Sequence, residues 1–299
     1  NKPKYVKVAV HIIAQNREDI PDDTNYRVEQ MIDYLNIGFE KTFESMKPDD
    51  DINFTPGNKN MNFNFELYKN ADTPDLNYYI IDSTMEYYSE YWRNGYNIFY
   101  SDVPGDWGSD IICTDYYGIS YENNICNIFV SIVNDDYEIY PATAYATLGQ
   151  YSGGTKSHII WGRYSALPPY PQWTNYVYTH EMGHWLGLSH TFPGNGNEAF
   201  EGDPGDGDGL ADTPFTKALP FNPSYLDSDG NPWPKNSIFI PDTDPNDPGR
   251  DPIYNHMGYT LGPYQSRFTD DQLYLMAIVV ENYLTNLYNN ENNKNSKID

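Results

Sequence analysis

Residues 180–190 read HEMGHWLGLSH, and this stretch decides the fold class. Residues four apart lie on nearly the same face of a helix, so His180 and His184 can bind one ion from successive turns. Gly187 lets the backbone leave the helix through conformations that other residues avoid, and that turn brings His190 round as a third ligand. Because neutral imidazole is a good zinc ligand, the spacing predicts a zinc site.

Three protein ligands leave a fourth position open for water, which is the arrangement of a catalytic zinc site rather than a structural one. Glu181 directly follows the first ligand and is turned far enough to miss the metal and reach a metal-bound water. We therefore predict that Glu181 is the general base of a peptide hydrolysis and passes the proton to the leaving amine. Two alternatives are a core helix with hydrogen-bonded histidines and an inactive metal-binding domain, and the intact Glu181 argues against the second.

A second motif, NHMGY, occupies residues 255–259. A Met at this distance after a zinc motif is typical of a turn whose thioether forms an apolar floor beneath the metal, so we assign that role to Met257. Tyr259 is a candidate hydrogen-bond donor to the oxyanion that develops during hydrolysis. The alternative for Tyr259 is a buried side chain that supports the turn, and His256 is interpreted as a packing residue.

Together these motifs resemble those of the pappalysins, a branch of the metzincin zinc peptidases. The zinc motif and the Thr191-Phe192 that follows it are similar to the family's version, and residues 207–214, GDGLADTP, resemble its GD-x-hydrophobic-x-DTP element. The NHMGY turn resembles the Met-turn of the family, and residues 268–272, FTDDQ, resemble the start of its last helix. The chain departs from the family in lacking cysteines after the zinc motif and in having Gly258 where an acidic residue is common.

The resemblance implies an α+β, metzincin-like fold with two subdomains and a substrate cleft between them. Residues 1–187 would form the upper subdomain, with a twisted mixed sheet, a backing helix and the zinc helix. Residues 188–288 would form an irregular lower subdomain with an acidic calcium loop, the Met-turn and a C-terminal helix, and residues 289–299 a disordered tail. The segments Ile125–Val133 and Ala144–Leu148 would include the edge strand that pairs with an extended protein or peptide substrate.

Apolar periodicity supports this class independently of the resemblance. Val6, Val8, Val10 and Ile12 lie on one face of a predicted strand, and Ala9 and Ile13 on the other face indicate that it is largely buried. Residues 28–43 carry an apolar stripe at helical spacing that Asp22, Asp23 or Thr24 can cap. Residues 61–67 alternate apolar and polar side chains as a half-buried strand. Thr269 is a good N-cap for a final helix.

Charge and composition exclude several functions. The net charge is −25, from 18 basic and 43 acidic residues, so the surface repels nucleic acid and anionic membranes. No apolar run approaches the roughly 18 to 20 residues of a membrane span. We interpret the chain as the mature form of a secreted protein, in which Cys113 and Cys126 are either paired or buried as free thiols.

Twelve carboxylate residues lie between Glu198 and Asp251, against three basic ones. Calcium takes six to eight oxygen ligands, and closely spaced Asp and Gly residues let side chains and carbonyls converge on it. The tightest cluster, and our candidate for a structural calcium site, is Asp203, Asp206, Asp208, Asp212 and Thr213. The functions that compete with a zinc endopeptidase are a peptidase of another metzincin branch, a non-catalytic calcium-dependent binding module, and a hydrolase of other amides or esters.

Overall fold

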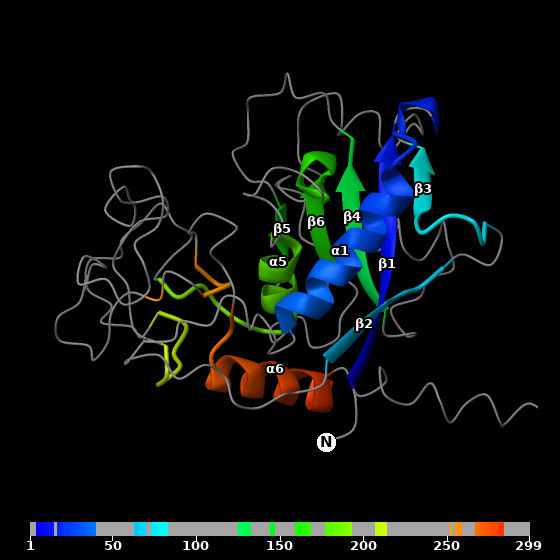
Figure 1. Cartoon of the computed structure of the whole chain (residues 1–299). Helices are drawn as coiled ribbons and strands as arrows, with labels where there is room; N and C mark the ends of the chain where they lie inside the picture. Colours follow the sequence, from blue (N-terminus) through cyan, green and yellow to red (C-terminus); the bar gives the residue numbers. More distant parts are fainter. Residues whose placement is uncertain are drawn as a thin grey trace, which may run out of the picture.

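The structure of the chain is a computed structural model that describes residues 4–14, 17–39, 63–69, 73–82, 125–132, 144–146, 159–168, 177–192, 207–213, 252, 255–258 and 267–283. The elements in these segments are β1 (Lys4–Ala14), η1 (Arg17–Asp19), α1 (Thr24–Phe39), β2 (Phe63–Leu67), β3 (Tyr79–Asp82), β4 (Ile125–Ser131), β5 (Ala144–Ala146), β6 (Ile159–Arg163), η5 (Tyr164–Ala166), α5 (Val177–Trp185) and α6 (Asp270–Tyr283), shown in Figure 1.

The strands form one mixed sheet in the order β2-β1-β4-β6-β5, and β3 pairs with the last part of β1. The pairs of β1 with β2, β3 and β4 and the pair of β4 with β6 are parallel, whereas β5 runs antiparallel to β6 at one edge. The α+β class and the mixed sheet predicted from the sequence are therefore confirmed.

Strand β1 lies in the interior of this sheet and is covered on both faces. Val6, Val8, Val10 and Ile12, the residues predicted for one face, are fully buried, and Ala9 and His11 on the other face are buried as completely. Parallel strands that are covered on both faces are apolar at nearly every position, which explains why the stretch does not alternate cleanly with polar residues.

Helices α1 and α5 lie side by side on one face of the sheet (Figure 1). The predicted stripe of α1 is buried, from Val28 to Phe39. The two helices approach closely at Gly38, where a Cβ atom would lie only 2.6 Å from Cγ2 of Thr179 on α5. Glycine at this position brings the backing helix directly against the helix that carries the metal ligands.

The two edges of the sheet differ. At β2, the side chain of Asn36 on α1 accepts a hydrogen bond from the Phe65 amide (2.8 Å) and donates one to the Phe65 carbonyl (3.1 Å). Asn36 thus occupies backbone groups of β2 that another strand would use. The opposite edge strand, β5, lies next to α5 and falls within the segment predicted to include the substrate-pairing edge.

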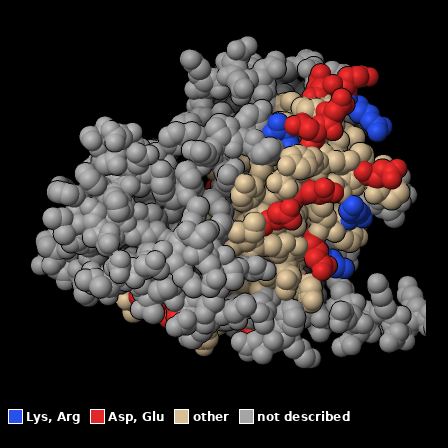
Figure 2. Space-filling view, in the orientation of Figure 1, with Lys and Arg blue, Asp and Glu red and all other residues tan. Residues whose placement is uncertain are grey.

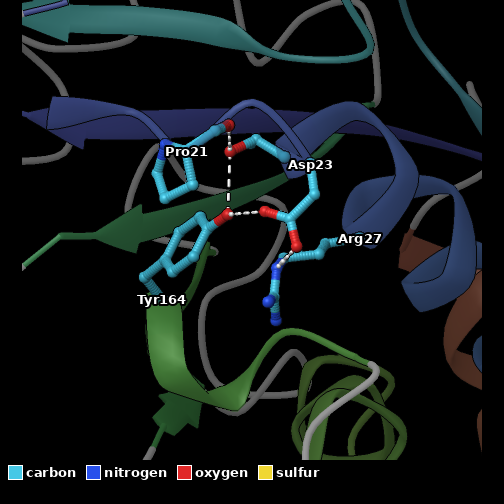
Figure 3. Close-up of polar contacts among 5 residues, drawn as sticks. Pro21, Asp23, Arg27 and Tyr164 are labelled. Carbon is cyan, nitrogen blue, oxygen red and sulfur yellow. Dashed lines mark hydrogen bonds and ion pairs between the residues drawn. The ribbon is translucent and has the colours of Figure 1, made fainter. Parts of the chain in front are cut away.

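A cluster of polar contacts attaches η5 to the start of α1 (Figure 3). The Tyr164 hydroxyl lies 2.8 Å from Oγ1 of Thr24 and 3.3 Å from Oδ1 of Asp23. The Arg27 guanidinium donates to the other Asp23 oxygen at 2.8 Å and lies 5.5 Å from the centre of the Tyr164 ring. Burial raises the pKa of Tyr164 to about 12, so it keeps its proton. These contacts hold the end of β6 beside α1.

Helix α6 begins with a capping box and lies below the sheet and α5 in Figure 1. The Oγ1 atom of Thr269 accepts a hydrogen bond from the Gln272 amide (3.1 Å), and Oε1 of Gln272 accepts one from the Thr269 amide (3.0 Å). The predicted N-cap is confirmed. Phe268, just before it, packs against Phe39 of α1, so α6 joins the same core as the sheet.

Four further expectations concern membrane spans, surface charge, the cysteines and the C-terminal tail. No helix in the described segments is long and apolar enough to cross a membrane. On the face shown in Figure 2, acidic side chains outnumber basic ones among the described residues. Cys126 is a free, fully buried thiol on β4, whereas Cys113 lies outside the described residues, as does the predicted disordered tail.

Candidate metal centre

The zinc motif is built on α5 and on the turn that ends it. A Schellman turn closes the helix: the Leu188 amide donates to the Gly183 carbonyl (2.9 Å) and the Gly187 amide to the His184 carbonyl (2.8 Å). Gly187 has a φ of 99°, in the left-handed region that side chains disfavour, as its place in the motif predicted. This turn redirects the chain so that His190 returns to the helix.

The three histidines meet at one point. The Nε2 atoms of His180 and His184 lie 3.1 Å apart, those of His184 and His190 3.0 Å apart, and those of His180 and His190 3.2 Å apart. Zinc–nitrogen bonds of about 2.0–2.1 Å at tetrahedral angles separate two ligand atoms by roughly 3.3 Å. The spacing of the three nitrogen atoms therefore fits one tetrahedral ion with a further position open.

Backbone carbonyls determine which ring nitrogens of two of these histidines are protonated. Nδ1 of His180 lies 2.6 Å from the His256 carbonyl, and Nδ1 of His184 lies 2.7 Å from the Leu188 carbonyl. Because a carbonyl oxygen only accepts, both Nδ1 atoms carry the proton and both Nε2 atoms present lone pairs. Two lone pairs 3.1 Å apart repel each other, so the arrangement suits a cation between them.

Two of the histidines, His180 and His184, are held neutral, which is the form that binds metal. Burial lowers the pKa of His184 to about 4 and shifts that of His180 well below its ordinary value, because each ring would have to lose its hydration to be charged. In the described part of the chain, these three histidines form the sole group of potential metal-binding side chains with the required spacing.

Glu181 lies on α5 beside the first histidine and is 5% exposed. Its Oε2 atom has no hydrogen-bond partner among the described residues. Burial raises the pKa of this carboxyl well above its ordinary value. A buried carboxyl next to the metal ligands, with one oxygen uncommitted, is able to take up and release a proton.

Met257 packs against α5 between the two helical histidines. A Cβ atom on Gly183 would lie 2.4 Å from the Met257 sulfur and 3.3 Å from a ring carbon of Phe268, so a side chain at this position would displace Met257 from this contact. Met257 is fully buried, and its carbonyl accepts a hydrogen bond from the Thr191 amide at 3.2 Å. The third histidine is supported by Phe192, whose ring stacks on it with centroids 4.7 Å apart.

The described members of the predicted calcium cluster contact α6. Asp208 accepts hydrogen bonds from the Leu210 amide (3.1 Å) and from Nε2 of Gln272 (2.7 Å), and Asp212 accepts one from the Asp271 amide (2.9 Å). Thr213 is buried, with Oγ1 3.4 Å from Oγ1 of Thr269. Burial raises the pKa of Asp208 to about 7.

Other predicted site residues lie outside the described part of the chain, namely Tyr259, Asp203 and Asp206. Sequence reasoning also missed the carbonyls of Leu188 and His256 and the side chains of Asn255 and Gln272 as parts of the site. Backbone carbonyls leave no signal in a sequence. Gln272 did have a signal in the sequence, because a Thr followed three residues later by a Gln is the pattern of a capping box.

Comparison with known proteins agrees with this geometry. Residues 126–281, just over half of the chain, match the peptidase M43 family, described as pregnancy-associated plasma protein-A. An extracellular metalloprotease of Colletotrichum graminicola is 36% identical over 142 residues, which are 46% of this chain and 41% of that protein. A similar protein of Neurospora crassa is 35% identical over 108 residues, 36% of this chain and 30% of that protein. The matches therefore span less than half of either relative.

Solved structures show a similar fold. Mature mirolysin of Tannerella forsythia, in complex with a cleaved peptide, superposes with a TM-score of 0.57 at 19% identity and covers 96% of this chain and 97% of that one. A promirolysin variant from the same organism superposes with a TM-score of 0.61 at 18% identity, covering 98% and 86% of the two chains.

Proposed function

The chain belongs to the pappalysin family of metzincin peptidases, and from this premise we propose that it is a secreted zinc-dependent endopeptidase. The observation that carries the proposal is the convergence of three imidazole nitrogens, two of them with lone pairs directed inward, beside a buried carboxyl. The extracellular names of the fungal relatives support secretion.

His180, His184 and His190 would hold the zinc ion. Zinc bound there would act as a Lewis acid and would lower the pKa of a water. Glu181 would take up the proton released in the attack on the peptide carbonyl and transfer it to the leaving amine, because its buried carboxyl lies directly after His180 and has one oxygen without a partner among the described residues. Met257 would form the apolar floor beneath the metal, where its side chain packs against Gly183 of α5.

We assign the substrate to the edge of the sheet at β5. This strand lies beside α5, and its outer backbone groups can pair with an extended peptide, whereas Asn36 occupies the opposite edge at β2. Mirolysin has been solved with a cleaved peptide, which favours the same class of substrate for this chain. A net charge of −25 opposes nucleic acid as a partner.

Two finer roles complete the proposal. Tyr259, two residues after Met257, would donate a hydrogen bond to the developing oxyanion. Tyr259→Phe should therefore lower turnover without changing the melting temperature. An equal loss of turnover and of melting temperature would assign Tyr259 a structural role.

A structural calcium ion would be held by Asp203, Asp206, Asp208, Asp212 and Thr213. Asp208 and Asp212 each accept bonds from the protein but retain further lone pairs for a cation.

Substitution of the base tests the function directly. Glu181→Gln should retain one zinc per chain and lose about 10²–10⁴-fold in turnover of a generic protein substrate, because general-base catalysis contributes about that much. Glu66→Gln, which neutralises an exposed carboxylate on β2, is the matched control and should cut at the wild-type rate. Wild-type turnover in Glu181→Gln would contradict the mechanism. A zinc-loaded wild-type chain that cleaves no protein would instead favour a binding module.

A further inference from the structure

We infer that Gln272 is a positioning residue for the metal ligand His180, acting through Asn255 and the carbonyl of His256. The inference rests on the proposed zinc site and assigns to the start of α6 a role that its capping box alone does not explain. The connection is a chain of hydrogen bonds between buried groups, each with a direction that the structure determines.

The first link is the contact that orients the ligand. Nδ1 of His180 donates to the carbonyl of His256 at 2.6 Å, so the place of that carbonyl decides where the ring points. The turn that carries it is shaped by Asn255, whose Oδ1 accepts from the Met257 amide at 2.8 Å and whose carbonyl accepts from the Gly258 amide at 3.1 Å.

The second link joins this turn to α6. Nδ2 of Asn255 donates to Oε1 of Gln272 at 2.9 Å, and both side chains are completely buried. The same Gln272 oxygen accepts from the Thr269 amide, so it is an acceptor and the other end of the side chain must be the NH₂ group. That group donates to Oδ2 of Asp208 at 2.7 Å.

The third link explains why a glutamine stands at this position. A capping box accepts Glu as readily as Gln, and a glutamate here would still accept the hydrogen bond from the Thr269 amide. A glutamate would, however, replace the NH₂ donor with an acidic group facing the buried carboxyl of Asp208, which is already fixed by the Leu210 amide, so the two acidic groups would repel each other or compete for one proton. The donor end of Gln272 is therefore matched to Asp208, and a mismatch there would displace Gln272, Asn255 and the His256 carbonyl in turn.

A donor–acceptor exchange tests this connection. In Asp208→Asn two amide donors face each other, in Gln272→Glu two carboxylates face each other, and the double variant Asp208→Asn/Gln272→Glu restores one hydrogen bond with reversed polarity. The double variant keeps the wild-type net charge. Oδ1 of the new asparagine can still accept from the Leu210 amide, so that contact is preserved.

Zinc affinity, measured by competition with a chelator, is the primary readout, and the visible absorption of the cobalt-substituted protein is the second. Each single variant should bind zinc several-fold to about tenfold more weakly, since partners of a ligating histidine are worth about 10–100-fold and this pair is more remote. Each should also show an altered cobalt spectrum. The double variant should recover both properties to within about twofold of wild type.

Thr269→Ala is the matched control, because it removes the acceptor of the Gln272 amide and the contact with Thr213 but leaves the bonds of the Gln272 side chain to Asn255 and Asp208 in place. It should lower the melting temperature of the metal-free protein while zinc affinity stays at the wild-type value. Equal loss of zinc affinity in Thr269→Ala, or no recovery in the double variant, would show mere destabilisation of α6 and overturn the inference.

Two further outcomes are distinguishable. Added calcium that restores zinc affinity in the single variants would place the effect at the calcium cluster and overturn the inference. A wild-type chain that binds no zinc would overturn the proposed function and this inference together, whereas normal zinc binding in all variants would overturn this inference alone.

Discussion

At the scale of single residues, burial of histidine has two consequences in this chain. His180 and His184 stay neutral and available to a metal, and His11 stays neutral inside the sheet, where its Nε2 lies 2.9 Å from Oδ1 of Asn127 and its ring stacks on Phe129. Burial lowers the pKa of His11 to about 4. The folded state therefore resists protonation that the unfolded chain accepts.

This gives a prediction for His11→Gln. The pKa of His11 is about 4 when folded and 6.5 in its ordinary state, so its contribution to stability is present above pH 6.5 and is lost as the pH falls through 4. In metal-free wild-type protein the free energy of unfolding should decrease over this interval, with His11 responsible for up to about 1.4 kcal/mol per pH unit. His11→Gln should have a shallower slope, measured by urea unfolding at several pH values.

The other buried histidines are present in both proteins, so the difference between the two slopes isolates His11. At pH 8 both proteins have a neutral side chain at this position, and any difference there reports packing and the hydrogen bond to Asn127. Identical slopes between pH 6.5 and 4 would mean that folding does not lower the pKa of His11.

Single residues differed in how far they could be predicted. The spacing of His180 and His184 follows from helix geometry, and the left-handed turn at Gly187 follows from its lack of a side chain, so local rules sufficed. Gly183 carried no such signal. A glycine at this position allows the close approach of Met257, which lies far away in the chain. Nothing in the sequence near Gly183 reveals that contact.

At the scale of elements, a side chain of the protein occupies backbone groups at the β2 edge of the sheet, and we propose that the β5 edge pairs with the substrate. Asn36 takes up the Phe65 amide and carbonyl on β2, as a neighbouring strand would do. An unoccupied edge strand is a template for association with other chains. Asn36 therefore directs pairing towards β5, where we place the substrate.

We expect Asn36→Ala to lower the free energy of unfolding by about 1–3 kcal/mol, because two hydrogen bonds of about 0.5–1.5 kcal/mol each are lost. It should also promote self-association through β2, seen as an increase in light scattering with protein concentration. Peptidase activity per folded molecule should stay unchanged, since β5 is on the opposite edge.

Gln30→Ala is the control on the same helix, because the Gln30 side chain bonds Asp33 on an exposed surface at 3.2 Å. Gln30→Ala should lower the free energy of unfolding by only a small fraction of the decrease expected for Asn36→Ala. Equal effects of the two substitutions would show that loss of a polar side chain from α1, rather than exposure of the β2 edge, is responsible.

Elements with a clear period were predictable, and their pairing was not. Residues 63–67 alternate as a strand should, and α1 has its stripe where the sequence placed it. The three residues of β5 are too few to define a period, and parallel or antiparallel pairing depends on contacts between distant strands. Only the family resemblance anticipated an edge strand there.

At the scale of the whole molecule, charge is the dominant feature. The chain has 43 acidic and 18 basic residues, and twelve of the acidic residues lie in the segment from Glu198 to Asp251. Such a concentration of like charge favours expanded states unless cations balance it. The division into subdomains at residue 187 stays a prediction, and it depends on how this acidic segment is stabilised.

The last prediction concerns removal of calcium. Both metals are stripped with a chelator, zinc alone is restored at one equivalent, and calcium is then titrated. The proposed cluster binds calcium only in the folded chain, so calcium at about 100 times its dissociation constant should stabilise the fold by about 2.7 kcal/mol and raise the melting temperature by several degrees. Activity should rise in parallel, because Asp208 and Asp212 contact α6, whose first turn is hydrogen-bonded to the turn carrying Met257.

Sodium chloride at equal ionic strength is the control for simple screening of charge. Equal stabilisation by sodium, or a melting temperature indifferent to calcium, would mean that the acidic segment is ordered by its own packing.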